Sequence, residues 1–246
     1  MDADTHNDEL SRAARVHYSF LPDPIDNDRI DLAFLYRPVQ TLGGDFCSAF
    51  WVSDKRLVIC MCDVTGHGVA SALYAARINT FVLAHSGSIS HPCELLPRLN
   101  QFLCDKLRGT GLYTTFFSAF VDFDKMQLSY VNAAHPPPLL FSSHSGEHRW
   151  LESDMSLLGY SESLTGNCQH HSLMLENGDK LLLYTDGLIE RPSYLGMDKG
   201  KAYLQSLLPQ YGHLNSSGFC EAVLMASLRD HGNAHDDMLA MTLTIK

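Results

Sequence analysis

The sequence predicts an α+β fold in which mainly antiparallel sheets carry helices on their outer faces. Apolar runs of strand length come in groups, and segments with helical periodicity come in pairs between these groups. A regular alternation of strand and helix, which would indicate a parallel sheet, does not occur. The chain has 246 residues, of which 45% are hydrophobic and 19% charged, so it can bury a substantial core.

The first half of the chain opens with a short helix and then gives three strands and two helices. Asn7 or Asp8 can cap the first helix, and Pro22 follows its end. We expect this helix either to pack on its own domain or to act as a regulatory or dimerising element. The expected elements, in order, are a helix ending near Phe20, strands at 30–36, 46–52 and 56–62, and helices at 68–85 and 92–107.

The second half continues with strands, an irregular segment and two further helices. Residues 152–168 are rich in Ser and Gly and form a candidate flap, and Asn177-Gly178 is typical of a two-residue hairpin turn. The expected elements, in order, are a meander of strands at 114–122, 127–132 and 139–141, a polar hairpin tip at 142–148, a hairpin of strands at 170–175 and 180–185, helices at 199–208 and 217–229, and a strand at 239–245.

Charge and cysteine usage narrow the function classes. The net charge of −10, without a basic cluster, argues against a nucleic-acid partner. No apolar run reaches the length of a membrane span, and the acidic N-terminus does not resemble a signal peptide. The seven cysteines are scattered, odd in number and without a CxxC pair, so we expect buried free thiols in a reduced, cytoplasmic protein.

Acidic residues stand where apolar runs meet a glycine turn or a chain reversal. The positions are Asp45, Asp63, Asp186 and the pair Asp236-Asp237. Carboxylates at the ends of several buried strands can converge, and burying them without compensation is costly. Hard oxygen ligands with no interleaved Cys or His suit Mg²⁺ or Mn²⁺ rather than zinc. The pattern therefore predicts a divalent-cation site.

Five motifs carry a family resemblance. They are GGDF at 43–46, DVTGHGVASAL at 63–73, VNAAHPPPLL at 131–140, LLLYTDGLIE at 181–190 and HDDM at 235–238. In this order and spacing, over roughly 30–246, the chain resembles the SpoIIE-type bacterial branch of the PPM (type 2C) protein serine/threonine phosphatases. The resemblance implies an αββα sandwich of two mainly antiparallel sheets flanked by helix pairs. It also implies a phosphatase domain at 26–246 behind an N-terminal helical or regulatory segment at 1–25.

The resemblance assigns roles to the aspartates. Asp63 would bridge two Mn²⁺ or Mg²⁺ ions, with the carbonyl of Val64 and the carboxylate of Asp45 as further ligands. Asp186 and Asp236 would bind one of the same ions. Asp237 would support the ligand Asp236 without binding a metal ion itself. The implied chemistry is two-metal hydrolysis, in which Asp63 and Asp45 are catalytic. From the residues alone, Asp63 could instead cap the following helix, and Asp186 could be a turn residue with Gly187.

Other candidates have weaker assignments. In the wider PPM group an acid histidine lies two residues after the bridging aspartate, but this chain has Thr65 there, and His67 lies four residues after it. Arg37 is not at the place of the group's phosphate-binding arginine. Thr65, Gly66, His67 and Arg37 are therefore candidates for supporting the site or contacting substrate. The chain also departs from the family at positions that shape loops and substrate contacts: Thr41, Ser48, Ala134 and Leu239.

The resemblance implies a phosphatase that acts on phosphoserine or phosphothreonine of a STAS-type anti-anti-sigma factor. An upstream sensor or receiver domain and a homodimer are further partners that it suggests. The alternative is a catalytically weak, phosphatase-like adaptor that binds a partner, but the complete aspartate set favours the enzyme. A diguanylate cyclase is disfavoured because Phe46 follows Asp45 directly, where the cyclase motif GGDEF has another acidic residue.

Overall fold

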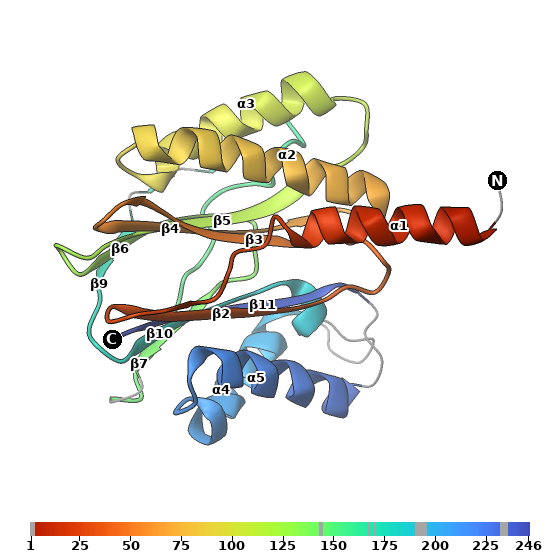
Figure 1. The fold of residues 1–246 in the computed structure, drawn as a ribbon. Helices are drawn as coiled ribbons and strands as arrows, with labels where there is room; N and C mark the ends of the chain where they lie inside the picture. The colour runs from red at the N-terminus through yellow and green to blue at the C-terminus, as the bar shows by residue number, and fades with distance from the viewer. Residues whose placement is uncertain (1–2, 143–144, 167, 170, 190–195, 232–235) are drawn as a thin grey trace. The chain divides into compact units, whose positions relative to one another are not determined.

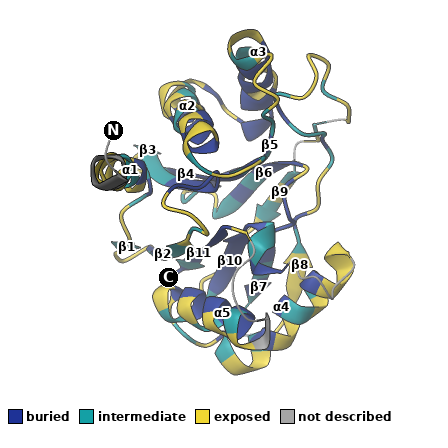
Figure 2. Cartoon of the chain, turned by 90° about the vertical axis from the view of Figure 1, so that its right-hand side faces the viewer, coloured by how far each residue is buried: buried dark blue, intermediate teal, exposed yellow. Residues whose placement is uncertain are grey.

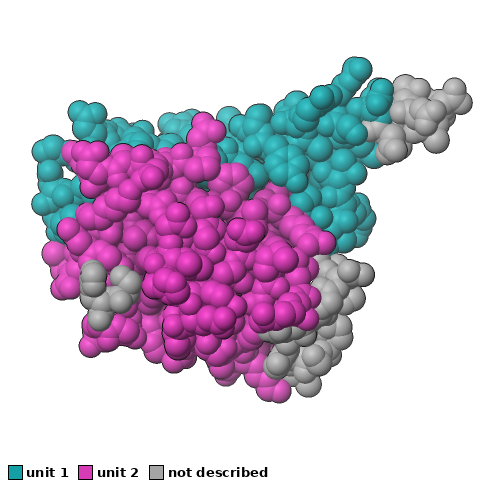
Figure 3. Space-filling model, turned by 60° about the horizontal axis from the view of Figure 1, so that its bottom comes forward, with its two compact units in different colours: residues 1–22, 38–135, 154–173 teal, residues 23–37, 136–153, 174–246 magenta. Residues whose placement is uncertain are grey.

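The computed structural model describes residues 3–142, 145–166, 168–169, 171–189, 196–231 and 236–246. Contacts divide the chain into two units, coloured separately in Figure 3. The first unit comprises residues 1–22, 38–135 and 154–173. The second unit comprises residues 23–37, 136–153 and 174–246. Each unit is built on one sheet with its own helices.

The first unit contains a five-stranded sheet with the order β3-β4-β5-β6-β9. Its strands are β3 (Phe46–Ser53), β4 (Arg56–Val64), β5 (Thr114–Asp122), β6 (Gln127–Ala133) and β9 (His171–Met174). Its helices are α1 (Ala3–Tyr18), α2 (Val69–His85) and α3 (Leu95–Leu107), with short 3-10 turns η1 (Ser86–Ser88) and η2 (Pro92–Glu94). Helices α2 and α3 cover one face of this sheet, and α2 buries one side while its outer side is exposed (Figure 2).

Strand β4 explains why the first unit's sheet could be located from its sequence. It pairs with β3 on one edge and β5 on the other, and every residue from Leu57 to Cys62 is fully buried. A strand covered on both faces needs apolar side chains at consecutive positions rather than at alternate ones. The uninterrupted apolar run before Asp63 therefore predicts a strand in the interior of the sheet.

The second unit contains a six-stranded sheet with the order β1-β2-β11-β10-β7-β8. Its strands are β1 (Ile25–Asp26), β2 (Ile30–Arg37), β7 (Leu139–Ser142), β8 (His148–Trp150), β10 (Asp179–Tyr184) and β11 (Met238–Ile245). Its helices are α4 (Met197–Tyr211) and α5 (Ser216–His231), with the 3-10 turn η3 (Asp186–Leu188) after β10. Phe219 and Val223 of α5 are buried in a core shared with Leu182, Tyr184 and Ala240 of the central strands.

The predicted class is confirmed, because both sheets consist of antiparallel pairs flanked by helices. Most predicted elements agree with the structure to within a few residues. The first helix begins at Ala3, ahead of the predicted caps Asn7 and Asp8. Strand β8 was missed, because its residues are exposed or half-buried and show no apolar run. Within the described residues, no helix is both long and apolar enough to cross a membrane.

Two predicted strand pairings are wrong. The strands on either side of Asn177-Gly178 do not form a hairpin, because β9 joins the first unit's sheet and β10 the second unit's. Strand β10 already has β11 on one edge and β7 on the other, so no edge is free for β9. Strand β7 likewise does not continue the meander of β5 and β6. The turn residues suggested that strands adjacent in sequence would pair. In the structure these strands pair with strands that are distant in sequence.

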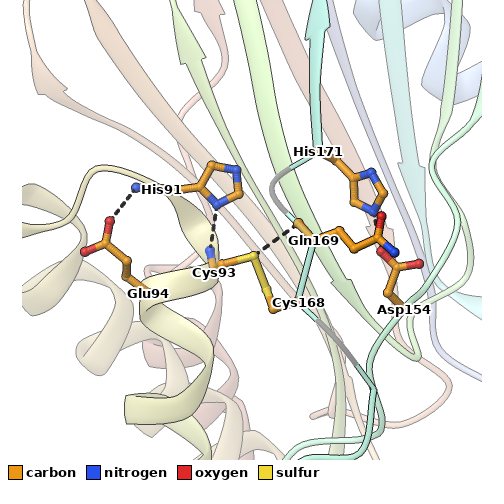
Figure 4. The surroundings of a disulfide bond; sticks show 7 residues. All are labelled: His91, Cys93, Glu94, Asp154, Cys168, Gln169 and His171. Carbon is orange, nitrogen blue, oxygen red and sulfur yellow. Dashed lines mark hydrogen bonds and ion pairs between the residues drawn. A yellow bond between two sulfur atoms is a disulfide. The ribbon is translucent and has the colours of Figure 1, made fainter.

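The prediction of seven free cysteines is also wrong. Cys93 and Cys168 form a disulfide with a Cα–Cα distance of 5.8 Å (Figure 4). The other five cysteines are free and buried, as expected. The two bonded residues lie 75 positions apart, and only the fold brings them together, so spacing gave no signal. Cysteine usage therefore gives no support to a reducing compartment.

Candidate functional site

The first unit brings Asp45 and Asp63 to the same end of its sheet. Asp45 directly precedes β3, and Asp63 is the penultimate residue of β4, one position beyond the Phe46–Cys62 pair. Burial raises the pKa of the Cys62 thiol well above its ordinary value, and the nearby Cys60 thiol, Asp63 and Asp45 raise it further. Because Phe46 pairs with Cys62, Asp45 and Asp63 stand beside the same pair of residues at one end of β3 and β4. Asp45 is buried and Asp63 half-buried.

Gly44 allows the loop before β3 to approach the end of β4. A Cβ atom at Gly44 would lie 2.5 Å from the carbonyl oxygen of Val64 and 3.1 Å from Cβ of Ser71. No side chain larger than hydrogen fits there without moving backbone. The loop is tied further by the bond from the Gly68 amide to the Leu42 carbonyl. The GGD and DVTGHG motifs therefore form one packed cluster that contains Asp45, Asp63 and the Val64 carbonyl.

Hydrogen bonds from the start of β5 fix the backbone around Asp63. The Thr114 hydroxyl donates to the Asp63 carbonyl at 2.7 Å, and the Thr65 amide donates to the Tyr113 carbonyl at 2.9 Å. The Thr65 hydroxyl also accepts from the Tyr113 amide at 3.1 Å. Thr65 is thus engaged with backbone groups, as expected of a residue that holds a loop. Thr114 is fully buried and was not singled out from the sequence.

The remaining first-unit candidates divide into exposed and packed residues. Gly66 and His67 are exposed, and Gly66 has a φ of 81°, which suits glycine. Asn132 holds the NAAH loop, since its side chain donates to the His135 carbonyl and accepts from the His135 amide. Ala134 sits there at a φ of 55°, where the family usually has glycine.

The second unit places Asp186 and the Asp236-Asp237 pair at the end where β10 leaves and β11 enters its sheet. The Thr185 amide donates to the Leu239 carbonyl, and the Leu239 amide donates to the Thr185 hydroxyl, each at 3.0 Å. A Cβ atom at Gly187 would collide with the Asp237 carbonyl oxygen. The absence of a side chain at Gly187 therefore lets the Asp186 turn lie against the acidic pair.

The two members of the acidic pair have different environments. Asp237 is buried, its amide donates to Oδ1 of Asp236 at 2.8 Å, and the Tyr36 hydroxyl lies 3.5 Å from its Oδ2. Asp236 is exposed and Asp186 is half-buried. Arg37 is exposed and pairs in the ladder with Met238, next to Asp237. His235, which we expected to face solvent, lies outside the described residues.

The donor chemistry fits hard divalent cations. Each unit offers two or three oxygen donors at a sheet end, and the one thiol nearby, Cys62, is held in its neutral form by burial. Among the described residues, no group of three or more His, Cys, Asp or Glu side chains is arranged so that it could hold a metal ion. The supporting residues Thr114, Thr185 and Tyr36 escaped sequence reasoning. For Thr114 and Thr185, the only local signal in the sequence was a threonine next to an apolar run.

The chain matches the family model described as stage II sporulation protein E (SpoIIE) over residues 53–246. The phosphoserine phosphatase RsbP of Bacillus subtilis (strain 168) is 27% identical over 244 residues, which cover 97% of this chain and 58% of RsbP. The phosphoserine phosphatase RsbU of the same organism is 27% identical over 184 residues, covering 74% of this chain and 53% of RsbU. The chain thus spans a little over half the length of these two relatives.

Solved structures show the same fold. The RsbU and RsbW domains of Rv1364c from Mycobacterium tuberculosis match with a TM-score of 0.78 and 26% identity, over 92% of this chain and 63% of that one. The SiaA-PP2C domain of Pseudomonas aeruginosa matches with a TM-score of 0.80 and 21% identity over the full length of both chains. The family match covers more than half of the chain. The chain therefore belongs to the SpoIIE family and carries a serine/threonine phosphatase domain of the PP2C (PPM) type.

Proposed function

We propose that this chain hydrolyses phosphoserine or phosphothreonine esters of a regulatory protein in a reaction that depends on two divalent cations. The observation that carries the proposal is the packing of Asp45, Asp63 and the Val64 carbonyl around Gly44, where a side chain would not fit. A strand-end aspartate with only a capping or turn role would not need a second carboxylate and a closely packed backbone carbonyl beside it. Membership of the SpoIIE family supports the same activity.

In this proposal Asp45, Asp63, the Val64 carbonyl, Asp186 and Asp236 hold two Mn²⁺ or Mg²⁺ ions. Such ions, when bound, supply an activated water and neutralise the charge of the phosphoryl group. A relative of the same fold, RsbX, has been solved in complex with magnesium at 18% identity to this chain. That structure contains Mg²⁺ in the relative. For this chain both Mn²⁺ and Mg²⁺ are candidates.

The chain's own residues would orient this chemistry. Thr114 fixes the backbone of Asp63, and Thr65 holds the loop that follows it. In the second unit, the Asp237 amide donates to Oδ1 of the exposed Asp236 and so orients its carboxylate. Gly66 would leave room for the substrate. Arg37 and His67, both exposed, would support the site or contact substrate.

The substrate and the partners follow from the family. We propose a phosphorylated STAS-type anti-anti-sigma factor as substrate, and an upstream sensor or receiver domain as a source of control. The curated relatives are nearly twice as long as the part matched, which leaves room in them for such a domain. Residues 1–25, which lie ahead of every proposed ligand, would act as a regulatory or dimerising segment. A protein beginning at Asp26 should keep its activity and change its oligomeric state.

Phosphate release tests the proposal. The 246-residue chain should release phosphate from a generic phosphomonoester and from a phosphorylated STAS protein when Mn²⁺ is present. EDTA should abolish release, and added Mn²⁺ should restore it. Full turnover after metal stripping would contradict the two-metal reading. Binding of the phosphorylated STAS protein without any turnover would favour the alternative of a phosphatase-like adaptor.

A further inference from the structure

Residues 154–166, 168–169 and 171–173, which we call the strap, fold back within the first unit. The Ser156 amide donates to the Thr165 carbonyl at 2.9 Å, and the Thr165 amide donates to the Ser156 hydroxyl at 3.1 Å. Met155 and Gly166 form an antiparallel bridge beside this pair. The strap therefore has a closed outer loop, and ahead of β9 its described residues form single β-bridges rather than longer strands. What keeps it in place must come from contacts with other elements of the unit.

Two sets of hydrogen bonds fasten the first part of the strap. Leu158 exchanges both backbone bonds with Thr114, at 3.0 and 2.9 Å. The buried Asn100 side chain of α3 donates to the Ser161 carbonyl at 2.9 Å and accepts from the Gly159 amide at 2.8 Å. Thr114 is the residue whose hydroxyl donates to the Asp63 carbonyl. One residue thus connects the strap to the proposed metal ligand Asp63.

The disulfide fastens the last part of the strap to η2, ahead of α3. Figure 4 shows Cys93 on the short turn and Cys168 on the strap, with a dashed line between the Cys93 sulfur and Gln169 that marks the contact to the Gln169 carbonyl oxygen. This oxygen lies 3.2 Å from Sγ of Cys93, which as a disulfide sulfur has no proton to donate. Cys93 is buried and Cys168 is half-buried. The strap is therefore held covalently at one end and by hydrogen bonds at the other.

The other cysteines are poorly placed to respond to redox conditions. All five are buried. Burial raises the pKa of the Cys60 and Cys220 thiols to about 12, so almost none of either is in the reactive thiolate form at neutral pH. A change in redox conditions would therefore act on this chain mainly through the bond between Cys93 and Cys168.

We propose that the Cys93–Cys168 disulfide is a redox-sensitive fastening, and that its cleavage by a dithiol reductant loosens the strap and lowers the phosphatase activity. The effect on activity rests on the proposed function, whereas the loosening of the strap does not. The path from bond to site is short: the strap holds Thr114 through Leu158, and Thr114 holds the backbone of Asp63. A less ordered strap would leave the Asp63 carbonyl less firmly placed.

The reductive step balances as a thiol–disulfide exchange. A thiolate of the reductant attacks Sγ of Cys168, the more accessible sulfur, and the S–S bond breaks to release the Cys93 thiolate, which takes up a proton. The second thiol of the reductant then attacks the mixed disulfide and releases Cys168 as a thiol. The reductant leaves as a disulfide, having given two electrons and two protons. The Cys93 thiol can then donate to the Gln169 carbonyl, which already lies within reach.

Hydrogen exchange on the intact chain measures the fastening directly. Peptides covering 154–173 should exchange slowly in the oxidised protein, and reduction should speed their exchange by at least about tenfold, because local opening no longer has to strain a covalent link. Cys168→Ser should exchange fast in both conditions. Cys104→Ala, at a free buried cysteine of α3, is the matched control and should respond to reduction as the wild type does. Thiol titration of the unfolded protein should give five free thiols before reduction.

The outcomes separate the two proposals. The fastening is supported if reduction and Cys168→Ser loosen the same peptides, and if reduction has no further effect on Cys168→Ser. It is overturned if the oxidised protein titrates as seven thiols, or if the strap exchanges equally in both redox states. In the phosphatase assay with Mn²⁺, reduction should lower kcat by about threefold to tenfold in the wild type and leave Cys168→Ser unchanged. A protein inactive in both states with a redox-dependent strap would defeat the proposed function and keep the fastening.

Discussion

The two sheet ends that carry the aspartates are built differently. In the first unit, Asp45 is buried and Asp63 is part of a central strand, and the loop before β3 packs so closely on the end of β4 that only glycine fits at position 44. In the second unit, Asp186 lies on a 3-10 turn and Asp236 is exposed. The Asp237 amide donates to Asp236, and the Leu239 amide donates to the Thr185 hydroxyl next to Asp186. Both ends depend on a glycine where backbone segments approach closely, Gly44 in the first unit and Gly187 in the second. The comparison teaches that the ends differ in how far their aspartates are buried, since Asp45 is buried and Asp236 is exposed.

Loss of a carboxylate charge should have the largest effect. Asp63→Asn should lower turnover by about 10³-fold or more with the fold intact, because it weakens cation binding and the activation of water. Asp122→Asn is the matched control, since Asp122 ends β5 and pairs with Arg56 at the end of the β4–β5 ladder opposite to Asp63. Steady-state kinetics with saturating Mn²⁺ and circular dichroism would check both variants. Equal activity of the two variants would remove Asp63 from the site.

Glycine substitutions test how closely the backbone packs at each of the two sheet ends. Gly44→Ala should destabilise the chain by about 1–3 kcal/mol, because the added methyl group meets the Val64 carbonyl. Gly187→Ala meets the Asp237 carbonyl and should cost a similar amount. Gly87→Ala has open space around it and serves as the control. Urea unfolding gives the three values. A Gly44→Ala variant as stable and active as Gly87→Ala would refute the packing account.

Removal of single hydroxyl groups compares how much one polar contact contributes to stability at each sheet end. Thr114→Val deletes the buried 2.7 Å bond to the Asp63 carbonyl and should cost about 1–2 kcal/mol of stability together with part of the activity. Tyr36→Phe deletes a contact of 3.5 Å to Asp237 and should cost less than about 0.5 kcal/mol. Thermal melting and kinetics of both variants would test this order. A larger loss for Tyr36→Phe would mean that polar contacts fix the second end more firmly than its geometry suggests.

The smallest effect is expected at His67. This side chain is exposed on the loop after Asp63, and Thr65 holds that loop without it. His67→Ala should change kcat by less than about tenfold, the effect of losing a proton donor that water can partly replace. The pH profile of kcat should keep its shape. A loss as deep as that of Asp63→Asn would make His67 the general acid.

The aspartates could be found from the sequence because each has a local signal, an apolar run that ends beside a glycine or a reversal. The residues that hold them could not. Thr114 lies 51 positions from Asp63, and Tyr36 lies 201 positions from Asp237, so no spacing rule connects them. The same limit explains the missed disulfide and the false hairpin before Asp179, where pairing with distant strands decided the neighbours. Local patterns thus located the chemistry, and long-range contacts determined its support.

The central claim is that the carboxylates of both units serve one reaction, and a double-mutant cycle tests it most directly. Phosphate release with Mn²⁺ would be measured for the wild type, Asp63→Asn, Asp186→Asn and the double variant. If both residues hold the same pair of ions, the first loss already removes most of the catalysis, so the double variant should be no more than about tenfold slower than the slower single variant. Losses that multiply in the double variant, or full activity of Asp186→Asn, would contradict the account.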